Sequence, residues 1–191
     1  TPTATPVPGV TVTPSSTIPP GPGCIQLMQN TGFETGVYPW LPGKNELPAQ
    51  IVTAPYPGGA YAVGLGALAD NIYSYSSLRQ WIPVPASHPR VIVSFWAYTR
   101  AESLWGEDRQ QFVVLGAGDA VLAVPWKVLE NEQVWRQRVF DVFNVAGQTI
   151  GIYFNVINDG AGGRTSMFLD EVYVWACTPG HYPASLASSS P

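Results

Sequence analysis

The stretch Arg90-Val91-Ile92-Val93-Ser94-Phe95-Trp96-Ala97-Tyr98 alternates between two sets of side chains. Val91, Val93, Phe95 and Ala97 fall on one side of an extended chain, and Ile92, Ser94, Trp96 and Tyr98 fall on the other. Because side chains of a β-strand point alternately to its two faces, this period of two predicts a strand with one apolar face.

The same alternation recurs along the chain. Residues 133–143 and 150–157 show it, and apolar runs that Gly, Pro and Asn turns separate predict further strands at 25–30, 47–53, 60–67, 72–84, 110–117, 121–128 and 166–176. No amphipathic helix of ten or more residues is evident. Many short strands without helices between them predict an all-β antiparallel sandwich.

Composition divides the 191 residues into three parts. Residues 1–23 are an uncharged Thr/Pro-rich arm or linker, because 15 of these 23 residues are Thr, Ser or Pro. Residues 24–177 form the sandwich, and residues 178–191 are a Ser/Pro-rich tail or linker. The chain begins at Thr1 without Met or a signal peptide, so we expect a mature form, a processed form or a fragment.

The arm has two interpretations. It is a surface stalk, or its β-branched segment Val7–Thr13 adds a strand to a neighbouring subunit.

Charge and hydropathy exclude several classes of protein. Nine Lys and Arg against 13 Asp and Glu, with a net charge of −4, do not form the basic face that a nucleic-acid-binding protein needs. No apolar stretch approaches the ~18 residues of a membrane-spanning helix. We therefore expect neither nucleic acid nor a membrane span.

The two cysteines bracket the predicted sandwich. The first and last strands of such a fold often lie side by side, so Cys24 and Cys177 are expected to form a disulfide, and two buried free thiols are the alternative. Paired cysteines and a Thr/Pro arm favour an extracellular or cell-surface location.

Five segments resemble the galactose-binding-like jelly-roll domains. They are Asn30–Gly36 followed by Trp40, Gly59–Gly66, Ser77–Pro85, Val91–Tyr98 and Phe168–Val172, and they occur in the family's order. The resemblance implies a jelly-roll β-sandwich and places Trp40 and Trp135 in the core. The family includes carbohydrate-binding modules, accessory domains of secreted enzymes and structural domains of surface proteins, so the resemblance does not fix the function.

The resemblance also implies a structural Ca²⁺ ion. Its ligands would be Glu34, the carbonyl of Gly32, and Asp170, because calcium takes six to eight oxygen ligands from carboxylates and carbonyls. The alternative is that Asp170 accepts hydrogen bonds from amides of the first strands.

No catalytic constellation stands out, and we expect no enzyme. The sequence has two His and lacks the motifs of serine hydrolases, zinc proteases and P-loop proteins. Seven Trp and nine Tyr instead indicate a glycan-binding surface, because aromatic rings pack on the C–H faces of sugars. We expect one concave sheet face to bind polysaccharide through Trp96, Tyr98, Gln111, Tyr153 and Asn155, with Trp105 and Arg100 at its rim.

Two functions stay open at this point. The first is a non-catalytic glycan-binding module on a Thr/Pro stalk. The second is a structural subunit of an extracellular filament or surface layer, which self-associates through residues 1–23. In the second case a loop or a neighbouring subunit would cover the aromatic strip.

Overall fold

The computed structural model describes residues 11–14, 21–43, 46–53 and 58–180. These residues form an antiparallel β-sandwich, as the alternation predicts, with a single 3₁₀ turn, η1 (Ala117–Asp119). The twelve strands are β1 (Thr11–Pro14), β2 (Cys24–Gln26), β3 (Leu41–Pro42), β4 (Gln50–Thr53), β5 (Tyr61–Gly66), β6 (Tyr73–Pro83), β7 (Arg90–Ala101), β8 (Arg109–Leu115), β9 (Val121–Val128), β10 (Trp135–Phe143), β11 (Thr149–Asp159) and β12 (Thr165–Cys177).

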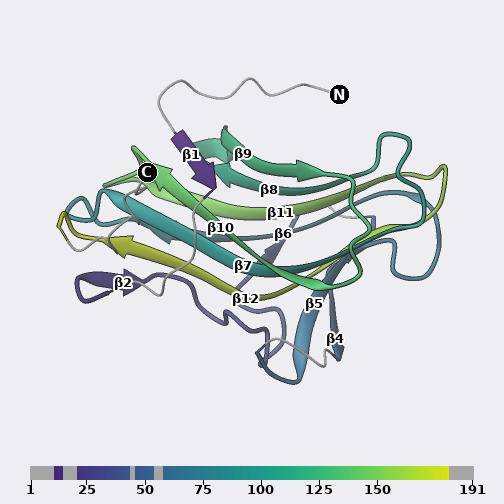
Figure 1. Cartoon of the computed structure of the whole chain (residues 1–191), viewed down its shortest axis with the longest axis horizontal. Coiled ribbons are helices and arrows are strands. Elements are labelled where there is room, and N and C mark those ends of the chain that lie inside the picture. Colours follow the sequence, from purple (N-terminus) through teal and green to yellow (C-terminus); the bar gives the residue numbers. More distant parts are fainter. Residues whose placement is uncertain (1–10, 15–20, 44–45, 54–57, 181–191) are drawn as a thin grey trace, which may run out of the picture.

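Two sheets make the sandwich. Sheet A has the order β1-β10-β7-β12-β5-β4, and β2 also pairs with β12. Sheet B has the order β3-β6-β11-β8-β9. Figure 1 shows β10, β7 and β12 side by side along the long axis of the molecule, whereas β4 and β5 run steeply away from them. The predicted jelly-roll sandwich is therefore confirmed.

The core lies between the two sheets. Phe95 of β7 is fully buried, and its ring centroid lies 4.9 Å from that of Phe154 on β11 and 5.4 Å from that of Phe112 on β8. Burying one such ring stabilises the fold by roughly 1.5–3 kcal/mol. The apolar set of the 90–98 stretch thus faces inward, as predicted.

One end of the sandwich is closed by the loop that contains Asn30–Gly36, the first of the five segments that resemble the family. The predicted strand 25–30 ends at Gln26, and the chain turns at Asn30, which has φ of 47°. The Nδ2 group of Asn30 donates hydrogen bonds to the carbonyls of Gly36 and Tyr38. The indole of Trp40 donates to the carbonyl of Asn30 and is buried, as the family resemblance implies.

The expected disulfide is present. Cys24 and Cys177 lie directly opposite each other in the β2–β12 pair and are joined by a disulfide. It connects the first strand after the arm to the last strand of the sandwich.

Segment 11–14 pairs antiparallel with β10 at the edge of sheet A within the same chain. Residues 7–10, the rest of the strand-like segment of the arm, lie outside the described residues. In the part of the chain that the structure describes, no helix is long and apolar enough to cross a membrane.

Candidate functional site

The outer face of sheet B carries an aromatic and polar surface. In β6 the alternation turns Ser77, Arg79 and Trp81 outward, whereas Leu78 and Ile82 are buried in the core. The register of β6, β11 and β8 brings outward residues of three strands into rows that cross the sheet. The rows are Trp81–Gly151–Leu115, Arg79–Tyr153–Val113 and Ser77–Asn155–Gln111.

A groove of about 490 Å³ follows this face; we call it the sheet B groove. Tyr75 and Tyr153 supply its rings, and Arg79 and Asp119 supply its charges. The full lining is Gly43, Tyr75, Ser77, Arg79, Leu115, Asp119, Val121 and Tyr153. A volume of this size lies within the usual range for small-molecule and oligosaccharide pockets.

Arg79 is held in a fixed position at the centre of the groove. Its Nη1 atom lies 2.6 Å from Oδ1 of Asp119, and its guanidinium lies 5.6 Å from the centroid of the Trp81 ring. Asp119 reaches Arg79 from η1, where it has φ of 63°. Both charges are therefore paired, and the guanidinium is ordered before any ligand arrives.

Tyr153 lies half-buried in the middle row. Burial raises the pKa of its phenol, and a hydrogen bond with Ser77 acts in the opposite direction. Beside it, Nδ2 of Asn155 donates to Oε1 of Gln111 at 3.2 Å. Two buried atoms of this face, Oδ1 of Asn155 and Nε of Arg79, have no hydrogen-bond partner among the described residues. Both atoms are fully buried, so a ligand at the surface of the sheet does not reach them as the side chains are placed.

The predicted glycan contacts do not share one face, so that prediction was wrong. Gln111, Tyr153 and Asn155 lie on the outer face of sheet B. Trp96 and Tyr98 lie on β7 and therefore on the outer face of sheet A. The outer faces of two packed sheets point in opposite directions, so one ligand chain cannot contact both sets.

Trp105 lies on the loop between β7 and β8, and its side chain is 86% exposed. It does not line the sheet B groove. Its role in glycan binding stays a prediction.

Aromatic rings form a row across the outer face of sheet A. Tyr98 of β7 lies between Trp135 of β10 and Phe168 of β12, with 5.8 Å between ring centroids on each side. Trp135 is half-buried there, so its expected place in the core was wrong. The reason is its register: Trp135 lies opposite Tyr98, which faces outward.

The predicted calcium ligands do lie close together. Glu34 accepts hydrogen bonds from the amides of Ala60 and Tyr61, and Oδ2 of Asp170 accepts one from the amide of Gly58. A side chain at Gly32 would meet Glu171 at 3.3 Å and Asp170 at 3.5 Å. The carboxylates of Glu34, Asp170 and Glu171 thus lie near one another. They come from the loop at residues 30–36 and from the bulge of β12, and both face the segment 58–61.

The donor chemistry of this cluster fits a cation. The pKa of Asp170 is raised to about 6, mainly by burial; two backbone hydrogen bonds lower it, and the charges of Glu171 and Glu34 raise it. No Lys or Arg forms an ion pair with these carboxylates among the described residues.

The side chains as placed do not form a metal site. Within the described ranges, no three His, Cys, Asp or Glu side chains are grouped so that they could hold a metal ion. Calcium would require Glu34 to turn from its amide partners. It stays a proposal.

Sequence reasoning missed several residues of the sheet B groove. Tyr75 and Arg79 alternate with buried residues along β6, and this pattern was available in the sequence. Asp119 comes from a 3₁₀ turn, and no sequence pattern indicated that it reaches Arg79.

No family model and no curated protein matches this sequence. Solved structures do match. A family 61 carbohydrate-binding module in complex with β-1,4-galactotriose has a TM-score of 0.60 and 20% identity, over 80% of this chain and 99% of that chain. A C-terminal family 22 carbohydrate-binding module from Clostridium thermocellum has a TM-score of 0.53 and 10% identity, over 86% and 99%.

An adhesin domain of Lys-gingipain from Porphyromonas gingivalis has a TM-score of 0.52 and 16% identity, over 80% of this chain and 99% of that chain. At these identities the similarity concerns the fold. The chain therefore has the jelly-roll β-sandwich fold of these carbohydrate-binding modules and of the adhesin domain.

Proposed function

We propose that this chain is a non-catalytic, extracellular carbohydrate-binding module, and that the sheet B groove binds the glycan. The observation that carries the proposal is the groove itself, in which two tyrosines and an ordered Arg79–Asp119 pair line about 490 Å³ of space. The fold shared with carbohydrate-binding modules supports the proposal.

The groove offers both kinds of contact that a sugar needs. The C–H face of a pyranose packs on an aromatic ring such as that of Tyr153 or Tyr75, and its hydroxyls bond to polar side chains. Arg79 and Asp119 line the groove and supply such polar side chains. Because each such bond replaces one to water, it contributes only about 0.5–1.5 kcal/mol, and weak binding is expected.

Charge selects the class of glycan. The charges of Arg79 and Asp119 cancel within the groove. We therefore propose a neutral, β-linked polysaccharide as the ligand, which agrees with the β-1,4-galactotriose bound by the family 61 module.

The test is affinity gel electrophoresis through galactan, xylan and mixed-linkage glucan, with Tyr153→Ala and Tyr98→Ala as a matched pair. Both tyrosines are half-buried on outer sheet faces, but of opposite sheets. We expect at least one polysaccharide to retard the native protein, Tyr153→Ala to abolish the retardation, and Tyr98→Ala to preserve it. Retardation that Tyr98→Ala abolishes and Tyr153→Ala preserves would contradict the proposal.

We also propose that Ca²⁺ binds at Glu34, Asp170 and the carbonyl of Gly32 and has a structural role. The supporting observation is the convergence of Glu34, Asp170 and Glu171 without a cationic partner among the described residues.

Self-association is a second candidate function. We propose that residues 1–23 can join one chain to a neighbour, as in a filament or surface layer. The observation that favours it is the pairing of Thr11–Pro14 with the edge strand β10. The same edge of another copy presents the same hydrogen-bonding groups, so exchange of this strand between chains would conserve the pairing.

A further inference from the structure

A second surface with glycan-binding chemistry lies on the outer face of sheet A. The aromatic row Phe168–Tyr98–Trp135 crosses strands β12, β7 and β10. On β12, Ser166 lies two residues before Phe168, and on β7, Arg100 lies two residues after Tyr98. Gln133 precedes Trp135 by two residues. Because side chains at i and i+2 of a strand share a face, Ser166 and Arg100 form a polar row directly beside the aromatic row. Gln133 precedes β10 and lines the same pocket as these two residues.

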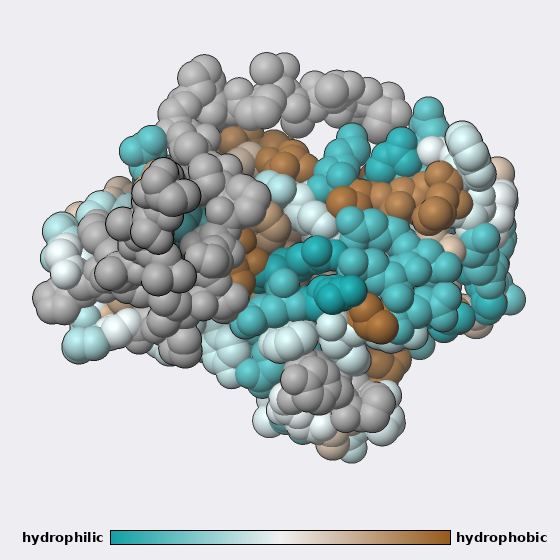
Figure 2. All heavy atoms as spheres, in the orientation of Figure 1, coloured by the Kyte–Doolittle hydropathy of each residue, from teal (hydrophilic) through white to brown (hydrophobic). Residues whose placement is uncertain are grey.

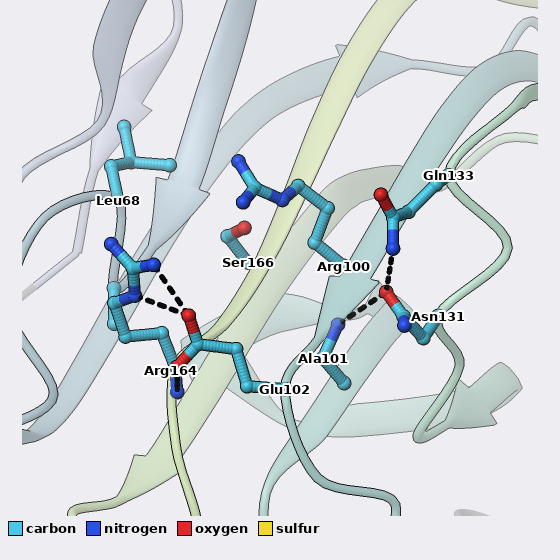
Figure 3. A pocket seen from close by; sticks show the side chains of 9 residues that line it. Leu68, Arg100, Ala101, Glu102, Asn131, Gln133, Arg164 and Ser166 are labelled. Carbon is cyan, nitrogen blue, oxygen red and sulfur yellow. Dashed lines mark hydrogen bonds and ion pairs between the residues drawn. The ribbon is translucent and has the colours of Figure 1, made fainter.

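The polar row opens into a small pocket of about 70 Å³. Figure 3 shows the Arg100 guanidinium reaching over Ser166, between Leu68 and Gln133. The lining is Ala67, Leu68, Arg100, Ala101, Glu102, Asn131, Gln133, Arg164 and Ser166. A pocket of this volume admits a substituent of a sugar, such as a carboxylate, and not a whole ring.

Charge in the pocket is positive after pairing. Arg164 binds Glu102 through Nε, at 2.8 Å from Oε1, and through Nη2. Arg164 is the main cause of the lowered pKa of Glu102, so this carboxylate is ionised and already neutralised. Arg100 forms no ion pair among the described residues and is exposed. Its guanidinium therefore supplies several donors and a second positive charge, which also acts on Glu102 without forming an ion pair with it.

The amides on the other side of the pocket are fixed in orientation. Oδ1 of Asn131 accepts hydrogen bonds from the amide of Ala101 and from Nε2 of Gln133, each at 3.1 Å. This leaves Nδ2 of Asn131 and Oε1 of Gln133 without a bond to any described residue, as a donor and an acceptor for hydroxyls.

The aromatic row is rigid and accessible. Tyr98 meets Trp135 at an interplanar angle of 61° and Phe168 at 79°, so each ring supports its neighbour. Phe168 lies opposite Gly64, where a side chain would come within 3.3 Å of its ring. All three rings are half-buried, so part of each still faces solvent.

Outside the atoms drawn in grey, the face of the molecule in Figure 2 is mainly hydrophilic, with smaller hydrophobic areas.

We propose that this surface binds an acidic polysaccharide: a uronate carboxylate pairs with Arg100 in the pocket, and its pyranose ring packs on the Phe168–Tyr98–Trp135 row. A planar carboxylate accepts two parallel hydrogen bonds from a guanidinium, which gives the pocket its selectivity. This site lies on the face opposite the sheet B groove and takes a charged ligand rather than a neutral one.

The test is isothermal titration calorimetry with polygalacturonate and with its methyl ester, which has the same backbone without the charge. We expect polygalacturonate to bind at 50 mM NaCl, more weakly at 500 mM, and the ester to bind at least tenfold more weakly. Arg100→Gln should weaken binding of polygalacturonate at least tenfold and leave the melting temperature unchanged, because Arg100 is exposed.

The control is Arg136→Gln, which removes an equal charge from β10. Arg136 follows Trp135, points to the other side of the strand and is 59% exposed. We expect it to bind polygalacturonate like the native protein. Equal weakening by both substitutions would mean general attraction to a polyanion and would overturn the proposal, as would equal binding of the ester.

Tyr98→Ala and Tyr153→Ala distinguish this site from the sheet B groove. Tyr98→Ala should weaken binding of polygalacturonate, and Tyr153→Ala should not. The reverse result places the acidic chain in the groove and refutes the proposal. Absence of neutral-glycan binding would count against the proposed function and leave this result unaffected.

Discussion

Loss of the Cys24–Cys177 disulfide is expected to cost as much stability as the most severe single core substitution. The bond joins residues separated by 153 positions. In the chain-entropy treatment a loop of that length restricts the unfolded chain by about 17 cal/mol/K, or about 5 kcal/mol at 25 °C. For a domain of this size, that corresponds to a fall of roughly 10–20 °C in the melting temperature.

Guanidinium unfolding followed by circular dichroism measures this effect. The native protein is unfolded with and without dithiothreitol, and the variant Cys24→Ala with Cys177→Ala serves as the control, since dithiothreitol should not change its unfolding. Alanine is chosen because Cys177 is fully buried beside Ile92 and Val139, where a hydroxyl would lack a partner. A difference below about 1 kcal/mol between oxidised and reduced protein would refute the entropic reasoning.

Three further predictions concern the core, the metal and the arm. Phe95→Ala should lower the free energy of unfolding by about 3–5 kcal/mol, because the ring is fully buried among Phe112, Phe140 and Phe154. A loss below about 1 kcal/mol in a denaturant titration would contradict this packing. Chelator should lower the melting temperature, since calcium at 100 times its Kd adds about 2.7 kcal/mol, and Asp170→Ala should remove that sensitivity; an unchanged melting temperature of the native protein argues against the site. Deletion of residues 1–23 should leave the circular dichroism spectrum intact and reduce the number of chains per sedimenting particle; an equal number of chains with and without the arm would exclude self-association through it.

Alternation within a strand predicted which residues are inside. Phe95 and Ala97 are buried and Trp96 and Tyr98 face outward, as the 90–98 stretch indicates. Alternation does not say which sheet a strand joins, because pairing depends on contacts between distant segments. The predicted aromatic face therefore combined outward residues of β7 with those of β8 and β11, which belong to the other sheet.

Sequence reasoning found the disulfide but only part of the groove. The pairing of Cys24 with Cys177 followed from their positions at the two ends of the sandwich. The Arg79–Asp119 pair did not, because it joins residues from a strand and a 3₁₀ turn that are 40 positions apart. Strand β3 has only two residues, too few to show any period, and yet it pairs with β6 beside the groove.

The indole N–H signals of the seven tryptophans, in a ¹H–¹⁵N spectrum recorded during titration with a neutral oligosaccharide, test the central claim most directly. Trp81 lies beside Arg79 on the outer face of sheet B, Trp135 lies on sheet A, and Trp105 lies on an exposed loop. Binding in the sheet B groove predicts a progressive shift of the Trp81 signal while the Trp135 and Trp105 signals stay in place. A shift of Trp135 or Trp105 with an unchanged Trp81 signal would contradict the account.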